Sequence, residues 1–266
     1  MSDYVLGVNQ KELERLEFQH GVWKDVTNDF ISRCGVSRGM KCLDVGAGPG
    51  FVSLDLLNIV GNDGEVTALE PSKLYSEYFQ NLCKEKGITN TKFVSSNIEE
   101  ADLPENYFDF VFVRWVIGFV PDPELFLSKI YSALKPGGTI AIQDYNYEGL
   151  TRYPQTEIFK DVPDAVRDYY RKGGGNPYIA LKIPELFRKL GITLTDYKPN
   201  IKAGGKDSLV FEWVHRFLVG HFSSMANLGV ISAREADEMF QDWLEHRYQT
   251  DAVIFSPIVV DVAGKK

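Results

Sequence analysis

The chain has few cysteines, no long apolar stretch and no excess of basic charge. Its three cysteines, Cys34, Cys42 and Cys83, include no C-x-x-C pair, which favours reduced structural thiols over a disulfide framework or a zinc site. No stretch reaches about eighteen consecutive apolar residues, the length read as a membrane span. The N-terminus also lacks a basic segment followed by an apolar one. These absences predict a cytoplasmic protein without membrane insertion.

The charge balance narrows the choice of partner. The chain carries 37 acidic and 29 basic residues, which gives a net charge of -8. A negative protein is repelled by phosphate backbones and by anionic lipid surfaces. We therefore expect a small-molecule partner and no nucleic acid, while the oligomeric state has no signal in the sequence.

From about residue 40 onward, short apolar runs alternate with amphipathic helical patterns, as in a parallel sheet covered by helices. The runs KCLDV, EVTALE, KFVSS, FDFVFV and TIAIQD supply the first five expected strands. Because these strands are almost wholly apolar, we expect both faces of the sheet to be buried. The sequence therefore predicts an α/β fold: a doubly wound, seven-stranded Rossmann-like sheet with six parallel strands, an antiparallel last strand and a helical lid.

We interpret residues 1–266 as a single domain. Its parts are, in chain order, an N-terminal helical cover (1–38), a cofactor-binding core (40–144), lid inserts on the substrate side (145–184 and 207–248), and a last strand with the tail (249–266). The cover should pack on the core through one helical face that carries Leu13, Leu16, His20, Trp23 and Phe30. We expect a helix from Pro184 to Leu190, and IFSPIVVDVA to form the last strand.

The most informative run is LDVGAGPGF, residues 43–51, in which an apolar strand breaks into closely spaced glycines. The spacing is G-x-G-x-G, and the third glycine of a dinucleotide-binding G-x-G-x-x-G turn is replaced by Phe51. Asp44 places a carboxylate at the strand tip, where it repels a phosphate and suits a cationic ligand. S-adenosylmethionine, with its amino group and sulfonium, fits this arrangement better than a nicotinamide dinucleotide. The alternative interpretation of this run is a tight turn with a purely structural role.

A second acidic residue supports a nucleoside ligand. Glu70 ends the second strand, twenty residues after Gly50. In this topology an acid at that place can accept hydrogen bonds from both ribose hydroxyls. Taken alone, Glu70 is equally an exposed loop carboxylate, and the glycine loop favours the ribose-binding interpretation.

Together these motifs resemble the class I S-adenosylmethionine-dependent methyltransferases of the small-molecule, ubiquinone-biosynthesis-like type. LDVGAGPGF resembles the first motif of the family, LEPS carries its ribose-binding acid, and VSSNIEEADLP resembles its adenine-binding segment. RWVIGFVPDPELFLSKIYSALKPGGTIAIQDY resembles the fourth and fifth motifs. RLEFQHGVW and GGGNPYIALKIPELFRKLGI resemble flanking signatures of one subgroup. The resemblance covers most of the chain and identifies no substrate.

The resemblance implies a set of residues that contact S-adenosylmethionine or its product S-adenosylhomocysteine. Asp44 would lie near the amino group, Glu70 at the ribose and Arg114 at the methionine part, through its backbone or with its side chain paired elsewhere. Asn97 stands where relatives commonly have Asp, so the adenine amino group would meet an amide oxygen instead of a carboxylate. The full expected set is Gln19, Asp44, Gly46, Ala47, Gly48, Gly50, Phe51, Glu70, Pro71, Asn97, Ile98, Arg114 and Trp115.

The choice of catalytic group stays open. Many relatives carry a Glu-His pair after the fourth strand, where this chain has Gly118 and Phe119. Candidate bases are His20 on the N-terminal helix, although a histidine there is more often a satisfied core residue, and Asp144 at the tip of the fifth strand. Arg114 and Trp115 occupy the place of the extra acid that a magnesium site needs, so we expect no metal.

We therefore expect an enzyme that transfers a methyl group to an O, N, S or C nucleophile of a small, partly apolar molecule. Alignment of the nucleophile with the already activated sulfonium supplies much of the rate. Two alternatives remain. The first is a noncatalytic or regulatory protein that binds S-adenosylmethionine, and the second, against the glycine spacing, is an NAD-dependent oxidoreductase. The aromatic residues Trp213, Phe217, Phe222 and Trp243 are read as core rather than as a substrate pocket.

Overall fold

The computed structural model describes residues 10–266 and contains a central seven-stranded sheet in the order β3-β2-β1-β4-β5-β10-β7. Strand β10 runs antiparallel to both of its neighbours, and the other pairs in the sheet are parallel. The strands are β1 (Lys41–Val45), β2 (Glu65–Leu69), β3 (Thr91–Val94), β4 (Phe108–Arg114), β5 (Leu134–Asn146), β7 (Thr193–Asn200) and β10 (Ile258–Lys265). This arrangement confirms the predicted Rossmann-like fold with six parallel strands and one antiparallel strand.

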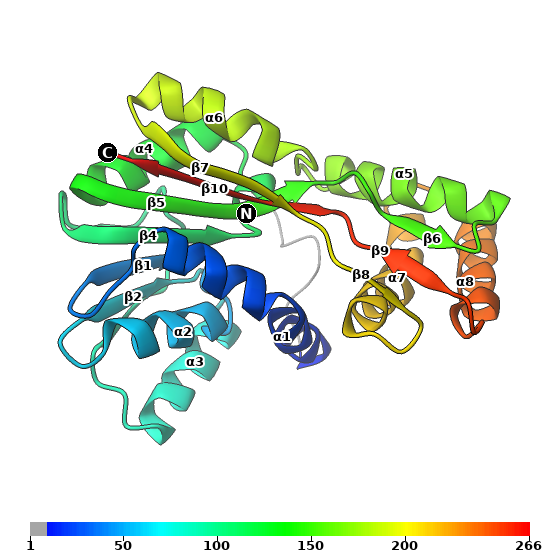
Figure 1. The fold of residues 1–266 in the computed structure, drawn as a ribbon, viewed down its shortest axis with the longest axis horizontal. Coiled ribbons are helices and arrows are strands. Elements are labelled where there is room, and N and C mark those ends of the chain that lie inside the picture. Colours follow the sequence, from blue (N-terminus) through cyan, green and yellow to red (C-terminus); the bar gives the residue numbers. More distant parts are fainter. Residues whose placement is uncertain (1–9) are drawn as a thin grey trace.

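Helices cover both faces of the sheet. Successive strand residues point to opposite sides, so each face carries apolar side chains that the helices bury. Cys42, Phe110 and Phe112 pack toward one face with α1 (Gln10–Arg33), α2 (Phe51–Val60) and α3 (Lys73–Glu85). Leu43, Val111 and Val113 pack toward the other face with α4 (Pro123–Ala133) and α6 (Ile179–Leu190). Figure 1 shows these two helical layers on either side of the strands.

The remaining elements form the lid, at one end of the sheet (Figure 1). It contains α5 (Glu157–Lys172), α7 (Leu209–Asn227), α8 (Ala233–Arg247) and a small antiparallel sheet of β6 (Thr151–Tyr153), β9 (Val253–Phe255) and β8 (Ala203–Gly205). Fully buried aromatic rings, among them Phe159, Phe211 and Trp243, form its core. The same cluster includes Trp23 of α1 and Tyr145 and Tyr147 at the end of β5 or just beyond it. The lid is therefore packed against the core and the cover.

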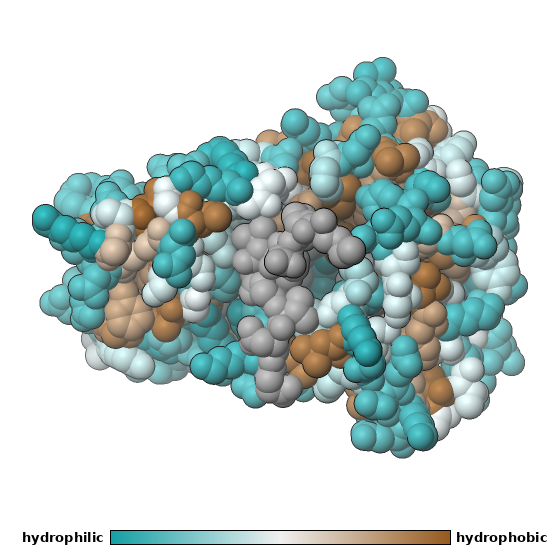
Figure 2. Space-filling model, turned by 180° about the vertical axis from the view of Figure 1, so that it is seen from behind, coloured by the Kyte–Doolittle hydropathy of each residue, from teal (hydrophilic) through white to brown (hydrophobic). Residues whose placement is uncertain are grey.

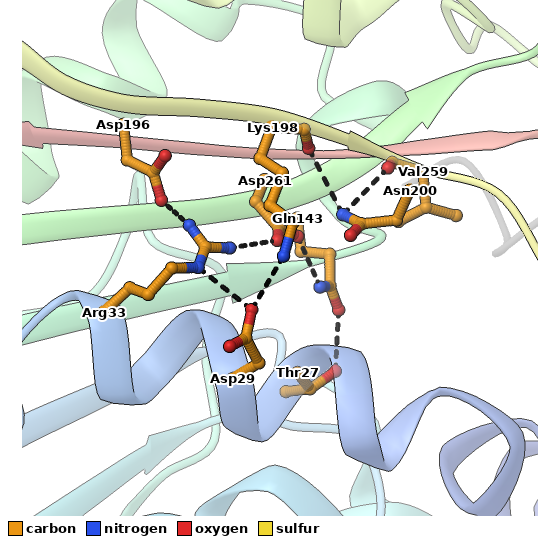
Figure 3. Close-up of polar contacts among 9 residues, drawn as sticks. All are labelled: Thr27, Asp29, Arg33, Gln143, Asp196, Lys198, Asn200, Val259 and Asp261. Carbon is orange, nitrogen blue, oxygen red and sulfur yellow. Dashed lines mark hydrogen bonds and ion pairs between the residues drawn. The ribbon is translucent and has the colours of Figure 1, made fainter.

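Helix α1 is tied to the sheet by a chain of polar contacts (Figure 3). Thr27 donates to Gln143 on β5 over 2.7 Å, and Gln143 donates to Asp261 on β10 over 2.7 Å. The guanidinium of Arg33 pairs with Asp261 at 2.6 Å and also with Asp196 on β7. Because Gln143 and Asp261 are fully buried, each of these hydrogen bonds satisfies a group that would otherwise be costly to bury. The cover is thus fixed across β5, β10 and β7.

Two element predictions were wrong. The segment IFSPIVVDVA forms two strands, β9 in the lid sheet and β10 in the central sheet, because Pro257 has no N–H to donate to a ladder and separates them. Helix α6 begins at Ile179, and Pro184, the expected first residue, lies inside it. The small lid sheet was not predicted at all, since strands of three residues are too short to show a periodic pattern.

No helix within residues 10–266 is both long and apolar enough to cross a bilayer. In Figure 2, hydrophilic residues dominate the visible face, and hydrophobic residues appear between them in smaller groups.

Candidate functional site

A cavity of about 900 Å³ lies between the carboxyl ends of the central strands, helix α1 and the lid. One wall is formed by the segments that follow β1, β2, β3 and β4, and the opposite wall comes from the lid. Crevices outside the carboxyl ends of parallel strands are where open α/β sheets bind ligands. Pockets for small ligands usually span about 300–1,000 Å³, so this cavity lies at the upper end of that range.

Two of the three glycines after β1 are required by packing within the protein. Gly46 has φ +68°, and a Cβ atom there would lie 2.3 Å from Val116. Gly50 has φ +82°, and its Cβ would lie 2.2 Å from the Phe79 ring. Gly48, in contrast, has no atom within 4 Å of the Cβ position and lines the cavity. The loop can therefore approach a ligand closely at Gly48, while Gly50 is placed against Phe79 and not at the cavity wall.

The carboxylate of Glu70 is held at the cavity by two backbone amides. Gly48 N–H donates to Oε2 over 2.8 Å, and Ser72 N–H donates to Oε1 over 2.7 Å. Burial raises the pKa of Glu70, while these two hydrogen bonds oppose the rise. Each carboxylate oxygen has more than one acceptor site, so both oxygens can still accept hydroxyl protons from a ligand.

Asp44 and Arg114 place opposite charges on the same wall. Asp44 is 2% exposed and accepts a hydrogen bond from Ser53 Oγ over 2.6 Å. Burial raises its pKa to about 6, so the carboxylate is mostly ionised at neutral pH. Burial lowers the pKa of Arg114 to about 10, and its guanidinium therefore stays charged at neutral pH. The wall can accept a ligand that carries both a positive and a negative group.

The Arg114 guanidinium is oriented by neutral partners. Its Nη1 donates to Thr27 Oγ1 over 3.1 Å, and its Nη2 lies 3.1 Å from His20 Nδ1. The charges of Asp44 and Asp55 act on it, but within residues 10–266 no carboxylate forms a direct ion pair with it. A buried cation without a directly paired anion favours an anionic ligand group.

His20 does not line the cavity. Its Nε2 lies 3.3 Å from Asp55, its Nδ1 contacts Arg114, and its ring stacks on Phe51 at 5.5 Å. Burial lowers the pKa of His20, so the neutral ring can accept from Arg114 and donate to Asp55. Both ring nitrogens are therefore engaged by protein groups.

Asp144 also lies outside the cavity wall. It accepts hydrogen bonds from the backbone N–H of Tyr145 over 2.8 Å and of Gly118 over 3.2 Å. Burial raises its pKa to about 7. Asp144 was expected at the strand tip, but β5 continues to Asn146, where it still pairs with Ile258. The carboxyl thus holds the segment after β4 in place from within the sheet.

The lid wall is aromatic and carries no charged side chain. Two aromatic residues of the segment after β4 pack against it. Phe119, at the place of the missing histidine, lines the cavity and stacks on Tyr170 at 5.2 Å. Trp115 has φ +54° and stacks on Tyr145 at 5.9 Å. The residues of this wall, from the end of β5 and from the lid, are Tyr145, Tyr147, Leu150, Tyr170, Gly173, Trp213, Val214, Phe217, Leu218 and Pro257. An apolar, flat molecule fits such a surface.

The structure brings most of the predicted cofactor contacts to one cavity. Ile98 is buried at the wall, and the neighbouring Asn97 is exposed. The predicted residues that line it are Gln19, Asp44, Gly46, Ala47, Gly48, Phe51, Glu70, Pro71, Asn97, Ile98, Arg114 and Trp115. Within the described chain, no group of three or more His, Cys, Asp or Glu side chains has the arrangement of a metal site.

Sequence reasoning missed several wall residues. Arg15, Leu16 and Tyr75 were not predicted, and Trp213 and Phe217 were assigned to the core. Both aromatic residues are buried in the lid core and also reach the cavity, whereas Phe222 and Trp243 only pack. Helical spacing alone cannot separate these cases, because it reports a buried face and not what lies against it.

Comparison with known families agrees with this geometry. The sequence model of a family described as "Methyltransferase domain" matches residues 36–188. The ubiquinone/menaquinone biosynthesis C-methyltransferase UbiE of Psychromonas ingrahamii is 29% identical over 148 residues, which are 54% of this chain and 58% of that protein. A demethylmenaquinone methyltransferase of Geobacillus is 30% identical over 53% of this chain and 59% of that protein. The chain thus aligns with somewhat more than half the length of these curated relatives.

Solved structures share the fold over nearly the whole chain. The geranyl diphosphate C-methyltransferase of Streptomyces coelicolor, crystallised with S-adenosylhomocysteine, aligns with a TM-score of 0.59 at 10% identity, covering 92% of this chain and 81% of that one. The [4+2]-cyclase SpnF aligns with a TM-score of 0.56 at 15% identity, covering 91% and 80%. At these identities the likeness shows the fold alone.

Proposed function

Because the chain belongs to the class I S-adenosylmethionine-dependent methyltransferases, we propose that it transfers a methyl group to an O, N, S or C nucleophile of a small, partly apolar molecule. The observation that carries the proposal is the single cavity that joins two unlike walls. One wall has the glycine loop, the carboxylates of Asp44 and Glu70 and the buried guanidinium of Arg114, and the lid wall is aromatic and uncharged. Such a cavity suits a charged nucleoside on one side and an apolar acceptor on the other.

The first wall fits S-adenosylmethionine, which when bound supplies a methyl group on an activated sulfonium. Glu70 would accept the ribose hydroxyls, and the backbone at Gly48 leaves room beside it. Asp44 would attract the amino group, and the Arg114 side chain would hold the carboxylate. The proposal thus uses the guanidinium of Arg114, whereas the sequence analysis expected a backbone contact or a side chain paired elsewhere. Ile98 and Asn97 remain our proposed contacts to adenine.

The second wall would orient the acceptor and exclude water. Burial raises the pKa of Tyr147, so its hydroxyl stays protonated and serves as a donor, not as a base. His20 and Asp144, the candidate bases, are engaged by other protein groups and lie outside the wall. We therefore assign His20 to the positioning of Arg114 and Asp144 to the positioning of the segment around Gly118. Catalysis would rest on alignment in a dry site.

Two measurements test this function. Calorimetric titration with S-adenosylhomocysteine should show one binding site per chain, because the product keeps the ribose, amino and carboxyl groups that the first wall recognises. Incubation with S-adenosylmethionine labelled on its methyl group and a metabolite extract should then give a labelled small molecule that partitions into organic solvent. A folded protein that does not bind S-adenosylhomocysteine would refute the proposal.

A second candidate is cofactor binding without methyl transfer. It is favoured by the position of both candidate bases outside the cavity wall, and the cyclase SpnF shows that this fold also carries other chemistry. S-adenosylhomocysteine binding together with no labelled product from any extract would select it. The cytoplasmic location and the small-molecule partner inferred from the sequence stay predictions.

A further inference from the structure

Gln19 lies where helix α1 meets the lid, and its side chain lines the cavity at 6% exposure. Its Oε1 accepts two hydrogen bonds, from Arg15 Nη1 over 2.8 Å and from Trp213 Nε1 over 3.0 Å. Both partners can only donate, so Oε1 and not Nε2 must face them. The orientation of the amide is therefore determined by its surroundings.

The partners of Gln19 are themselves fixed. Arg15 forms a two-pronged ion pair with Glu12, with N···O distances of 2.7 and 2.6 Å, on the same helix. Trp213 belongs to α7 of the lid, is 4% exposed and packs edge-on against Trp23 of α1 at 5.4 Å. The network thus joins the cover to the lid across 194 residues of sequence, and it holds the Gln19 amide rigidly.

The amide nitrogen of Gln19 has no partner within residues 10–266. Its two N–H groups are then available to a ligand, and a nearly buried amide donor gains most from an oxygen that accepts a hydrogen bond. The carboxylates of the wall, among them Asp44 and Glu70, come from segments after β1 to β4 and not from the lid. Arg114, beside Asp44, is a better partner than Gln19 for the carboxylate of the proposed cofactor.

We propose that the side-chain amide of Gln19 determines specificity for the methyl acceptor: it donates a hydrogen bond to a carbonyl, ether or hydroxyl oxygen on a flat, otherwise apolar molecule. This inference rests on the proposed function and deepens it. It differs from the sequence prediction, which placed Gln19 among the cofactor contacts. The amide would fix which edge of the flat molecule faces α1, and hence which of its atoms lies toward the S-adenosylmethionine bound at the first wall.

The test uses three two-ring probes of similar shape. Coumarin and chromone carry a carbonyl oxygen that accepts hydrogen bonds, and naphthalene carries none. Dissociation constants are measured by equilibrium dialysis on the full chain, with and without saturating S-adenosylhomocysteine. Wild type should bind at least one carbonyl probe about fivefold more tightly than naphthalene, the effect of one neutral hydrogen bond.

Two variants remove the donors in different ways. Gln19→Glu keeps an oxygen for Arg15 and Trp213 and replaces the amide nitrogen by a second oxygen. Gln19→Met keeps the approximate volume and removes both groups. Each should abolish the preference for the carbonyl probes and leave the dissociation constant of S-adenosylhomocysteine within about threefold, the equivalent of less than one hydrogen bond. Gln80→Glu on the exposed side of α3 controls for the added charge.

The outcomes separate the two proposals. Absence of a carbonyl preference in wild type, including failure of all three probes to bind, overturns the assignment of Gln19, as does a preference that survives both variants. If the Gln19 variants lose affinity for S-adenosylhomocysteine tenfold and keep the probe preference, Gln19 contacts the cofactor instead, and the proposal is likewise overturned. If S-adenosylhomocysteine does not bind but the probe preference depends on Gln19, the proposed function fails and the donor role of Gln19 stands.

Discussion

Replacing Glu70 with alanine removes the carboxylate that the backbone amides of Gly48 and Ser72 hold at the cavity. A hydrogen bond to a charged group contributes about 1.5–3 kcal/mol, and each 1.4 kcal/mol changes affinity tenfold. Loss of one such bond therefore weakens binding of S-adenosylhomocysteine by about ten- to a hundredfold, and loss of both by more. We expect Glu70→Ala to raise the dissociation constant by at least tenfold.

The assay is calorimetric titration with S-adenosylhomocysteine and with its 2′,3′-dideoxy analogue. In wild type, removal of the two hydroxyls should weaken binding by a similar factor, whereas in Glu70→Ala it should cost almost nothing further. The matched control is Glu77→Ala on α3, which deletes a surface carboxylate that is 58% exposed and should leave affinity unchanged. An equal penalty for the dideoxy analogue in wild type and Glu70→Ala would refute the assignment of Glu70 to the ribose.

Three further predictions concern the loop, the charge of the first wall and the cover. Gly50→Ala should lower the free energy of unfolding, measured by urea titration, by about 2–4 kcal/mol, because its Cβ would collide with Phe79. Gly48→Ala should lower it only by the backbone strain of about 1–2 kcal/mol. An equal decrease in the free energy of unfolding for the two variants would contradict this. Burial raises the pKa of Asp44 to about 6, so the ionised form that attracts the amino group is lost as pH falls. The dissociation constant of S-adenosylhomocysteine, measured by calorimetry, should therefore rise about tenfold from pH 7 to pH 5 in wild type and should not rise in Asp44→Asn. The same pH dependence of the dissociation constant in Asp44→Asn would show that Asp44 is not its source. Thr27→Val should lower the free energy of unfolding, measured by thermal unfolding, by about 1–3 kcal/mol, because buried partners lose a hydrogen bond. The control is Thr195→Val on the exposed edge strand β7. A Thr27→Val variant as stable as this control would reject the role of the contact.

The core of the fold and the cavity wall that carries the glycine loop were predictable from local sequence. Strands β1 and β2 are short, mainly apolar runs that end next to a glycine or a functional side chain, at Val45 before Gly46 and at Leu69 before Glu70. Parallel strands place their carboxyl ends at one edge, so residues such as Asp44 and Arg114 meet there whatever the loops between them contain.

The lid wall was not predictable in the same way. The contact of Gln19 with Trp213 joins residues 194 positions apart, and no local pattern reports it. The strands of the lid have three residues each, too few to show an alternation. The partners of His20 and Asp144 likewise come from other elements, so their engagement could be seen only once the chain was folded.

The central claim is that this cavity moves a methyl group from S-adenosylmethionine to an apolar small molecule. The most direct measurement is transfer of a labelled methyl group to a metabolite extract, with Glu70→Ala as the paired variant. The account predicts a labelled, organic-soluble product from wild type and a much slower reaction from Glu70→Ala when S-adenosylmethionine is limiting. No labelled product from a wild-type protein that binds S-adenosylhomocysteine would contradict it.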